Sequence, residues 1–206
     1  MMSDKPIVFV VDDDPGALRS LCWLIQEAGL PVRAFSSGRE FLEAYRGREG
    51  EGGCLVVDVR MPEMDGLEVQ RRLAERGVEM PILFLTAHGD VSTCAQAFRA
   101  GAFEFLEKPV DHAVLLHHIR KALARREAYR LHSEFAVRMQ RLTRAEKEVF
   151  DLLISGKSLK EIAYVRNVAV QTIWKHRVNI LQKMGVESDV ELVRIAAAQA
   201  ASGENR

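Results

Sequence analysis

The first 125 residues alternate short apolar runs with stretches of helical periodicity, and this alternation constrains the fold more than any other feature. Apolar runs such as Ile7–Val11 and Cys54–Val57 have the length of buried strands. Helical patterns lie between them, as in Pro15–Glu27, where Asp14 is a plausible N-cap and Gly29 a stop. Five strands separated by helices predict a parallel sheet that helices cover on both faces.

The pattern also predicts where this sheet ends and a second domain begins. The predicted strands are 7–11, 32–35, 54–57, 81–85 and 103–106, and the helices between and after them are 15–27, 37–45, 67–76, 91–100 and 111–125. Residues 126–140 contain neither Gly nor Pro and carry Leu131, Phe135 and Met139 four apart, which predicts a helical linker. The remaining predicted elements are all helices: 144–154, 159–165, 170–183 and 189–200. We therefore expect an α/β domain over 5–125 and an all-α domain over 141–206.

Composition excludes several classes of protein. A length of 206 residues accommodates two domains, and 48% hydrophobic and 28% charged residues are ordinary values for a globular chain with zero formal net charge. From Arg141 onward, 11 Lys and Arg face 8 Asp and Glu, which hints at nucleic acid as a partner of this part. Three scattered cysteines and a polar N-terminus favour a cytoplasmic protein, and no apolar run is long enough to make a membrane a partner.

Polar residues follow three of the predicted strands. Asp12 and Asp13 follow the first, Asp58 follows the third, and Lys108 comes shortly after the fifth. For each acid alone, a solvated side chain at a strand end is the better interpretation, but carboxyl ends of parallel strands meet at one edge of a sheet. Crowded carboxylates repel unless a cation neutralises them, and hard oxygen ligands suit Mg²⁺. With Thr86 supplying a hydroxyl, such a site suits a phosphoryl group on Asp58.

Four segments carry a resemblance to a known family. Val10–Asp14, Val57–Pro62, Leu85–Asp90 and Gly101–Pro109 resemble the receiver domain of two-component response regulators, with most likeness to the FixJ-type branch. The resemblance implies a flavodoxin-like sheet of order 2-1-3-4-5. It also implies that the protein is not an enzyme with a separate substrate, although a receiver catalyses its own phosphorylation and dephosphorylation.

The same resemblance implies roles for individual residues. Asp58 would accept a phosphoryl group from a sensor histidine kinase. Asp13, Asp58 and the carbonyl of Arg60 would hold Mg²⁺ (or Mn²⁺), with Asp12 acting through a water molecule.

Further residues of this set concern switching and signal lifetime. Thr86 and Phe105 would form the switch pair, and Lys108 would be joined to Pro109 by a cis bond. His88 lies two residues after Thr86, and Arg60 two after Asp58, so both are candidates for tuning dephosphorylation. For His88, a plain surface position is an equally good interpretation.

The C-terminal helices resemble a second family. Thr143 and Glu146 have capping-box spacing, and a short helix, a turn and the longer helix 170–183 follow. The motifs that resemble the LuxR/NarL-type DNA-binding domain are Leu142–Thr143, Glu146–Val149, Lys160–Ala163, Thr172–Ile173, His176–Arg177, Asn179–Ile180 and Lys183–Val186. This likeness implies a helix-turn-helix over about 159–183 whose second helix enters the major groove of double-stranded DNA.

The implied DNA contacts fall into two groups. Trp174, Lys175 and Val178 would face bases, whereas the phosphate contacts would come from Lys160, Thr172 and Arg177. The chain departs from the family pattern at Ala145, Arg166, Ala169 and Trp174. Ala169 stands where a Ser or Thr cap is common, and losing such a cap costs about 1 kcal/mol.

Together these features predict a DNA-binding response regulator in which phosphorylation of Asp58 controls dimerisation, promoter binding and transcription. The dimer would form through the 91–105 surface, and RNA polymerase is an expected partner. One alternative is a phosphatase with an aspartyl-phosphate intermediate, but such enzymes need a second acid where this chain has Arg60. Another is a regulator whose helix-turn-helix binds protein, and the salt dependence of DNA binding would distinguish it.

Overall fold

The structure is a computed structural model that describes residues 6–45, 53–87 and 91–203. Contacts divide the chain into two compact units, residues 1–127 and 128–206. The first unit alternates strands and helices, and the second is helical throughout its described elements. None of the helices in the described ranges has both the length and the apolar composition needed to cross a membrane.

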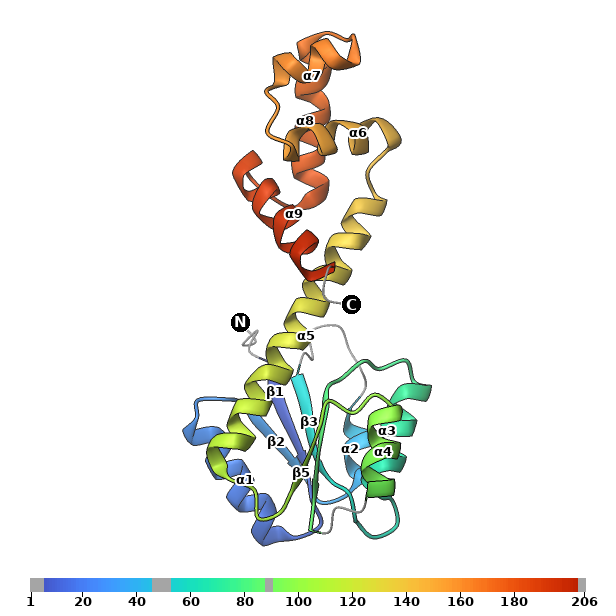
Figure 1. Cartoon of the computed structure of the whole chain (residues 1–206), viewed down its shortest axis with the longest axis vertical. Helices are drawn as coiled ribbons and strands as arrows, with labels where there is room; N and C mark the ends of the chain where they lie inside the picture. The colour runs from blue at the N-terminus through green and yellow to red at the C-terminus, as the bar shows by residue number, and fades with distance from the viewer. Residues whose placement is uncertain (1–5, 46–52, 88–90, 204–206) are drawn as a thin grey trace. The chain divides into compact units, whose positions relative to one another are not determined.

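The first unit contains a five-stranded parallel sheet in the order β2-β1-β3-β4-β5, which confirms the predicted fold (Figure 1). The strands are β1 (Ile7–Val11), β2 (Val32–Phe35), β3 (Gly53–Asp58), β4 (Ile82–Thr86) and β5 (Glu104–Glu107). Strand β4 begins one residue later than predicted because Pro81 has no N–H to donate to the sheet. The strand ends on Thr86, at the edge where the predicted site lies.

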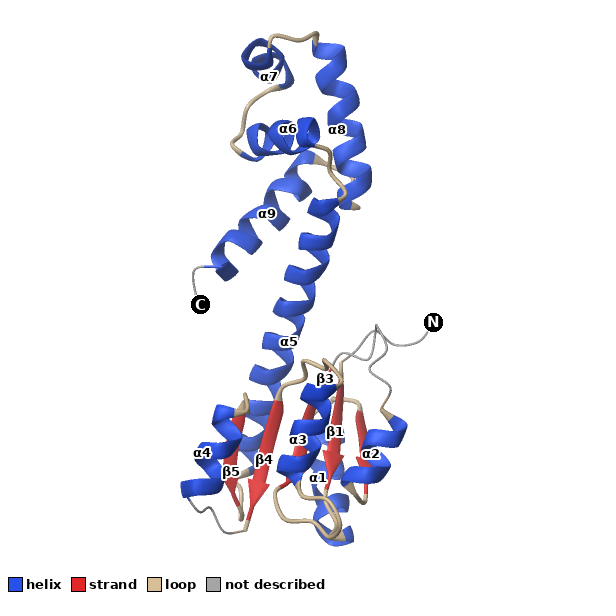
Figure 2. Cartoon of the chain, turned by 90° about the vertical axis from the view of Figure 1, so that its right-hand side faces the viewer, coloured by secondary structure: helices blue, strands red, loops and turns tan. Residues whose placement is uncertain are grey.

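Helices cover both faces of this sheet. They are α1 (Pro15–Glu27), α2 (Gly38–Ala44), α3 (Gly66–Glu75), α4 (Val91–Arg99) and α5 (His112–Gln140). Figure 2 shows α2, α3 and α4 on the near face and α1 on the far face with the first turns of α5. Asp14 caps α1 through the N–H groups of Gly16 and Ala17, as its position before Pro15 predicts.

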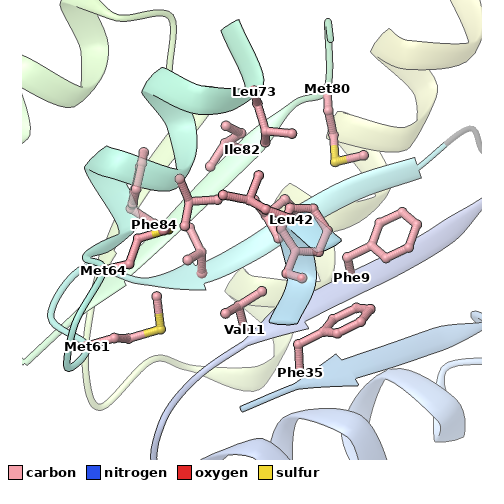
Figure 3. Packing of buried hydrophobic residues seen from close by; sticks show 14 of the residues in the cluster. Phe9, Val11, Phe35, Leu42, Met61, Met64, Leu73, Met80, Ile82 and Phe84 are labelled. Atoms are coloured by element: carbon pink, nitrogen blue, oxygen red, sulfur yellow. The ribbon is translucent and has the colours of Figure 1, made fainter. Parts of the chain in front are cut away.

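Alternation of side chains along the strands produces two hydrophobic cores. Phe9 and Val11 of β1 point toward α2 and α3, where Figure 3 shows them near Leu42. Val8 and Val10, one residue out of phase, pack with α1 and α5 instead. The side chains of Val8–Val11 in β1 are almost fully buried on both faces, as a central strand of a parallel sheet requires.

The second unit is a small helical domain. Its helices are α6 (Arg144–Ile154), α7 (Leu159–Arg166), α8 (Val170–Met184) and α9 (Asp189–Gly203). They pack around a single core that includes Ile162, Ile173 and Met184. Thr143 and Ser158 each begin a helix with a complete capping box. The turn between α7 and α8 passes through Asn167 in the left-handed conformation, with φ 51°.

Helix α5 continues without a break through the segment predicted to be a linker. Phe135 and Met139 pack against the core of the second unit, and the Phe135 ring lies 6.3 Å from that of Phe150. Arg138 donates a hydrogen bond of 3.0 Å to the carbonyl of Met184, at the C-terminal end of α8. The last turns of α5 are therefore part of the helical unit. The exact limits 5–125, 126–140 and 141–206 remain predictions.

Candidate functional site

The sheet register brings the three predicted acids together. Val11 of β1 lies opposite Val57 of β3, so Asp12 and Asp58 emerge side by side at the carboxyl edge. The carboxylates of Asp12, Asp13 and Asp58 each offer an oxygen atom, and these atoms lie within 4.8 Å of one another. Asp12 is buried, Asp58 is partly buried and Asp13 is exposed. The cluster is therefore open to solvent on one side.

Lys108 reaches this cluster from the end of β5. Its Nζ lies 2.8 Å from Oδ2 of Asp12 and 3.4 Å from Oδ2 of Asp58. The backbone N–H of Lys108 donates to the carbonyl of Thr86 at 2.7 Å, which fixes the residue beside β4. The peptide bond between Lys108 and Pro109 is cis, the geometry that the receiver resemblance implies.

The electrostatics of the cluster leave Asp58 incompletely stabilised. Burial raises the pKa of the Asp58 carboxyl above its ordinary value of 3.8, and the charge of Asp12 adds to the increase. Lys108 opposes the shift without cancelling it. For Lys108, burial favours the neutral form, but the hydrogen bond and charge of Asp12, followed by those of Asp58, raise the pKa of the ammonium group. A further cation would lower the pKa of Asp58.

The donor set fits a small divalent cation. One lysine faces three carboxylates, so the cluster is net negative when all of them are ionised. Carboxylate oxygens with access to water are the ligands that Mg²⁺ prefers in proteins, because this ion normally keeps several water molecules. The cluster is thus compatible with metal binding.

Thr86 and Phe105 lie on adjacent strands beside the cluster. Thr86 ends β4 and is buried, opposite Glu107 of β5. Phe105 is half-buried, and its ring lies 6.0 Å from that of Phe84. The aromatic side chain thus packs against the core on the face that carries α3 and α4.

Arg60 is exposed, two residues beyond Asp58, and its backbone N–H favours the ionised Asp58 carboxylate. Gly66 begins α3 directly behind this segment and donates a hydrogen bond of 2.9 Å to the carbonyl of Val59. A Cβ at Gly66 would lie 2.5 Å from the Asp58 carbonyl oxygen, so only glycine fits there. His88 lies outside the described residues.

Gln70 is a residue that the sequence analysis missed. Its amide Nε2 donates to the carbonyls of Ala97 (3.2 Å) and Ala100 (3.1 Å), so this side chain of α3 holds the C-terminal end of α4. Gln70 is almost fully buried. The available signal was its place between Leu67 and Leu73, where helical spacing puts a polar residue on an apolar stripe.

Most of the predicted DNA-contacting residues of the second unit are exposed to solvent. On α8, Thr172, Trp174, Lys175 and Val178 are exposed. Lys160 is exposed on α7. These side chains lie outside the core of the helical unit and are available to a partner.

Arg177 differs from the other predicted DNA contacts. Its Nε donates to both carboxylate oxygens of Asp189, at 2.8 and 2.9 Å, which ties α8 to α9. A phosphate contact by Arg177 would have to use the other guanidinium N–H groups. Ala169 precedes α8 and makes no side-chain capping hydrogen bond, because its methyl group has no acceptor atom. Arg166 pairs with Glu148 and so connects α7 to α6.

Comparisons with protein families identify both units. Residues 8–120 match the response regulator receiver domain, and residues 140–196 match bacterial regulatory proteins of the luxR family. The receiver domain implies a sensor kinase as partner, and the luxR-type domain implies DNA binding.

Individual relatives agree over nearly the whole chain. The response regulator protein TmoT of Ectopseudomonas mendocina is 38% identical, covering 95% of this chain and 90% of TmoT. The transcriptional regulatory protein FixJ of Azorhizobium caulinodans is also 38% identical, over 95% of this chain and 93% of FixJ.

Solved structures lead to the same family. The response regulator StyR has a TM-score of 0.65 and 40% identity, covering 94% of this chain and 98% of that one. Full-length FixJ from B. japonicum has a TM-score of 0.58 and 35% identity, covering 97% and 99%. Since the likeness to these proteins extends through both units, the chain belongs to the transcriptional response regulators that join a receiver to a luxR-type DNA-binding domain.

Proposed function

We propose that Asp58 is the phosphoacceptor of this response regulator and that its donor is a phosphohistidine of a sensor kinase. The observation that carries the proposal is the position of Asp58, partly exposed, 3.4 Å from Lys108 and clustered with Asp12 and Asp13. A carboxylate oxygen of Asp58 would attack phosphorus, the phosphorus–nitrogen bond to histidine would break, and an acyl phosphate would form. Lys108 would neutralise charge on the phosphoryl oxygens.

The metal in this proposal is Mg²⁺, or Mn²⁺ in its place. Asp13, Asp58 and the carbonyl of Arg60 would hold it, with Asp12 acting through a water molecule. The ion supplies positive charge that favours the ionised Asp58 and the transferred phosphoryl group. Support comes from the three carboxylates with oxygen atoms within 4.8 Å and from the net negative charge of the cluster.

The phosphorylation test uses a small-molecule phosphodonor and intact-mass measurement. The protein should gain one phosphoryl group in Mg²⁺, and the gain should disappear in EDTA and in Asp58→Asn. Asp65→Asn is the matched control, because Asp65 follows the same strand but caps α3 through the N–H of Glu68. Phosphorylation of Asp58→Asn at the wild-type level would contradict the assignment.

The switch in the proposal is the pair Thr86 and Phe105. Thr86 would move toward the phosphoryl group, and Phe105 would turn inward from its half-buried position against Phe84. The resulting change would reshape the 91–105 surface and favour a homodimer. NMR spectra with and without beryllofluoride test this switch. If the signals of Thr86, Phe105 and this surface do not shift, the mechanism is excluded.

The output of the proposed switch is promoter binding by a dimer. One helix-turn-helix contacts little DNA, and two half-sites a helical turn apart increase affinity. Beryllofluoride with Mg²⁺ should raise both the molar mass in solution and the affinity for an operator, with a steep salt dependence from phosphate contacts. An operator-bound dimer would then act on transcription through RNA polymerase.

We also assign the protein to the cytoplasm, because the kinase that phosphorylates it and the DNA that it binds would both be reached there.

The segment 126–140 is the proposed connection between the domains 5–125 and 141–206. Support comes from the continuity of α5 and from the packing of Phe135 and Met139 on the helical core. Replacing Met139 by Asp should uncouple promoter affinity from Asp58 phosphorylation while phosphorylation itself continues. Unchanged coupling would argue against a transmitting role for this segment.

We also propose that Arg60 and His88 tune the lifetime of the acyl phosphate, which the receiver itself hydrolyses. Arg60 is exposed two residues from Asp58, where its side chain has access to incoming water. Dephosphorylation rates of Arg60→Ala and His88→Ala should differ from wild type, with Arg39→Ala as an exposed control. Equal rates in all four proteins would remove this role.

A further inference from the structure

Helix α8 carries a row of apolar side chains on a side that faces solvent. Val170, Trp174 and Val178 are 43%, 54% and 37% exposed. Their spacing of four places them along one side of the helix. The core-facing residues of α8, which include Ile173, are on another side and are buried. The row is therefore not the edge of the domain core.

Trp174 is the largest side chain of this row and has the largest exposed fraction, so a partner could bury more apolar area on it than on the two valines. Its indole makes no hydrogen bond or ring contact among the residues that the structure describes. A tryptophan that is more than half exposed leaves a large apolar area in water, and burying that area on a partner is favourable. An unpartnered apolar row of this kind marks a binding surface.

The charge around the row indicates an anionic partner. Helix α8 contains no Asp or Glu in its 15 residues. Two of its cations, Arg177 and Lys183, pair with Asp189 and Glu146, which leaves Lys175 as the basic side chain available to a partner. Lys175 is exposed directly beside Trp174, and Lys160 is exposed on α7. Among macromolecules, this combination of basic side chains and the match to the luxR-type family favours DNA over a second protein.

The major groove of DNA offers one apolar feature to such a row. Of the four bases, only thymine presents a methyl group there, at C5, whereas the other base edges present hydrogen-bond donors and acceptors. We propose that Val170, Trp174 and Val178 form a thymine-reading surface, in which Trp174 packs on a thymine C5-methyl of the operator. The inference rests on the proposed promoter binding and adds the base that this chain selects.

The experiment removes the methyl group alone. Full-length protein with beryllofluoride and Mg²⁺ first selects its operator from random duplexes, and each thymine is then replaced singly by uracil. At one or more positions, wild type should bind uracil about fourfold more weakly than thymine, the effect of one buried methyl group. Trp174→Ala should bind more weakly overall and lose this thymine-to-uracil ratio at the same positions.

Two variants separate a reading role from general weakening. Lys160→Ala should reduce affinity for all sequences and lower the salt dependence, yet keep the thymine-to-uracil ratio. Trp174→Phe should keep part of the ratio, and it also replaces Trp174→Ala as the test if circular dichroism shows that the alanine variant is unfolded.

The outcomes distinguish this inference from the function on which it rests. Failure to select any DNA would overturn promoter binding and the inference together. A selected operator whose thymines can all be replaced by uracil without loss would overturn the inference alone. The inference would also fail if Trp174→Ala retained the wild-type ratio, or if this variant lost dimerisation and kept the operator preference.

Discussion

Two carboxylates, Asp58 in the receiver and Glu146 in the luxR-type domain, each have a lysine partner, but their pKa values are shifted in opposite directions. Glu146 is buried, Asp58 is partly buried, and each lies close to one lysine. Burial raises the pKa of Asp58 in spite of Lys108. Burial acts in the same direction on Glu146, but the hydrogen bonds from Lys183 and Thr143 outweigh it and lower the pKa of that carboxyl.

The number of partners per charge explains the difference. Lys108 is shared, at 2.8 Å from Asp12 and 3.4 Å from Asp58. Glu146 has Lys183 to itself at 2.6 Å and accepts a second hydrogen bond of 2.7 Å from the N–H of Thr143. A carboxylate with its own partners stabilises a fold, whereas one that shares its cation retains charge for an incoming ligand.

The largest expected effect is that of Glu146→Ala. Removing the carboxylate eliminates a buried helix cap and leaves Lys183 without its partner, so the free energy of unfolding of the helical unit should fall by about 2 kcal/mol. Urea denaturation measures this change. Glu161→Ala is the matched control, since Glu161 completes the exposed capping box of α7 and its loss should cost less than that of Glu146. Equal losses in the free energy of unfolding would show that the burial of Glu146 does not increase its contribution to stability.

Asp58→Asn should change stability in the opposite direction. The amide keeps the shape of the side chain but removes a partly buried charge that competes with Asp12 for Lys108, so receiver stability at pH 7 should rise. Thermal unfolding in EDTA measures the difference. A loss of stability would mean that Asp58 is fully satisfied by Lys108, and the contrast with Glu146 would disappear.

Lowering the pH should reduce the stability cost of the Asp58 charge and the stability contribution of Glu146 over two different pH ranges. The folded-state pKa of Asp58 lies above 3.8, so the cost of its charge is present at neutral pH, decreases as pH falls through that raised pKa, and is gone below 3.8. Glu146 contributes stability that is complete above 4.5 and is lost as pH falls through its lowered pKa. Unfolding midpoints of Asp58→Asn, Glu146→Gln and wild type from pH 7 to pH 3 measure both. The order of the two ranges would be reversed if the pKa directions were wrong.

The smallest expected effect concerns the uncapped start of α8. A hydroxyl in Ala169→Ser would accept a hydrogen bond from a free N–H of the first turn and stabilise the helical unit by about 0.5 kcal/mol. Chemical denaturation against wild type is sufficient to detect it, and Ala169→Gly should give no gain. A destabilised serine variant would indicate that the backbone at this position does not suit a cap.

Periodicity predicted the sheet because strand and helix patterns are local. It also predicted the three acids at one edge, since the carboxyl ends of parallel strands must meet there. What it missed depends on contacts between distant residues. The hydrogen bonds from Gln70 to α4 and from Arg177 to Asp189 join helices whose packing no local pattern specifies. The sharing of Lys108 between two acids likewise depends on distances, 2.8 Å to Asp12 and 3.4 Å to Asp58, that no local pattern specifies.

The close approach of Gly66 to the Asp58 carbonyl has a practical consequence for building chimeric regulators. Since a methyl group at position 66 would lie 2.5 Å from that oxygen, the end of β3 and the start of α3 have complementary surfaces that cannot be exchanged separately. A graft between receivers should therefore carry residues 58–66 as one block. Crossover points inside this block would join a strand end to a helix shaped for a different partner.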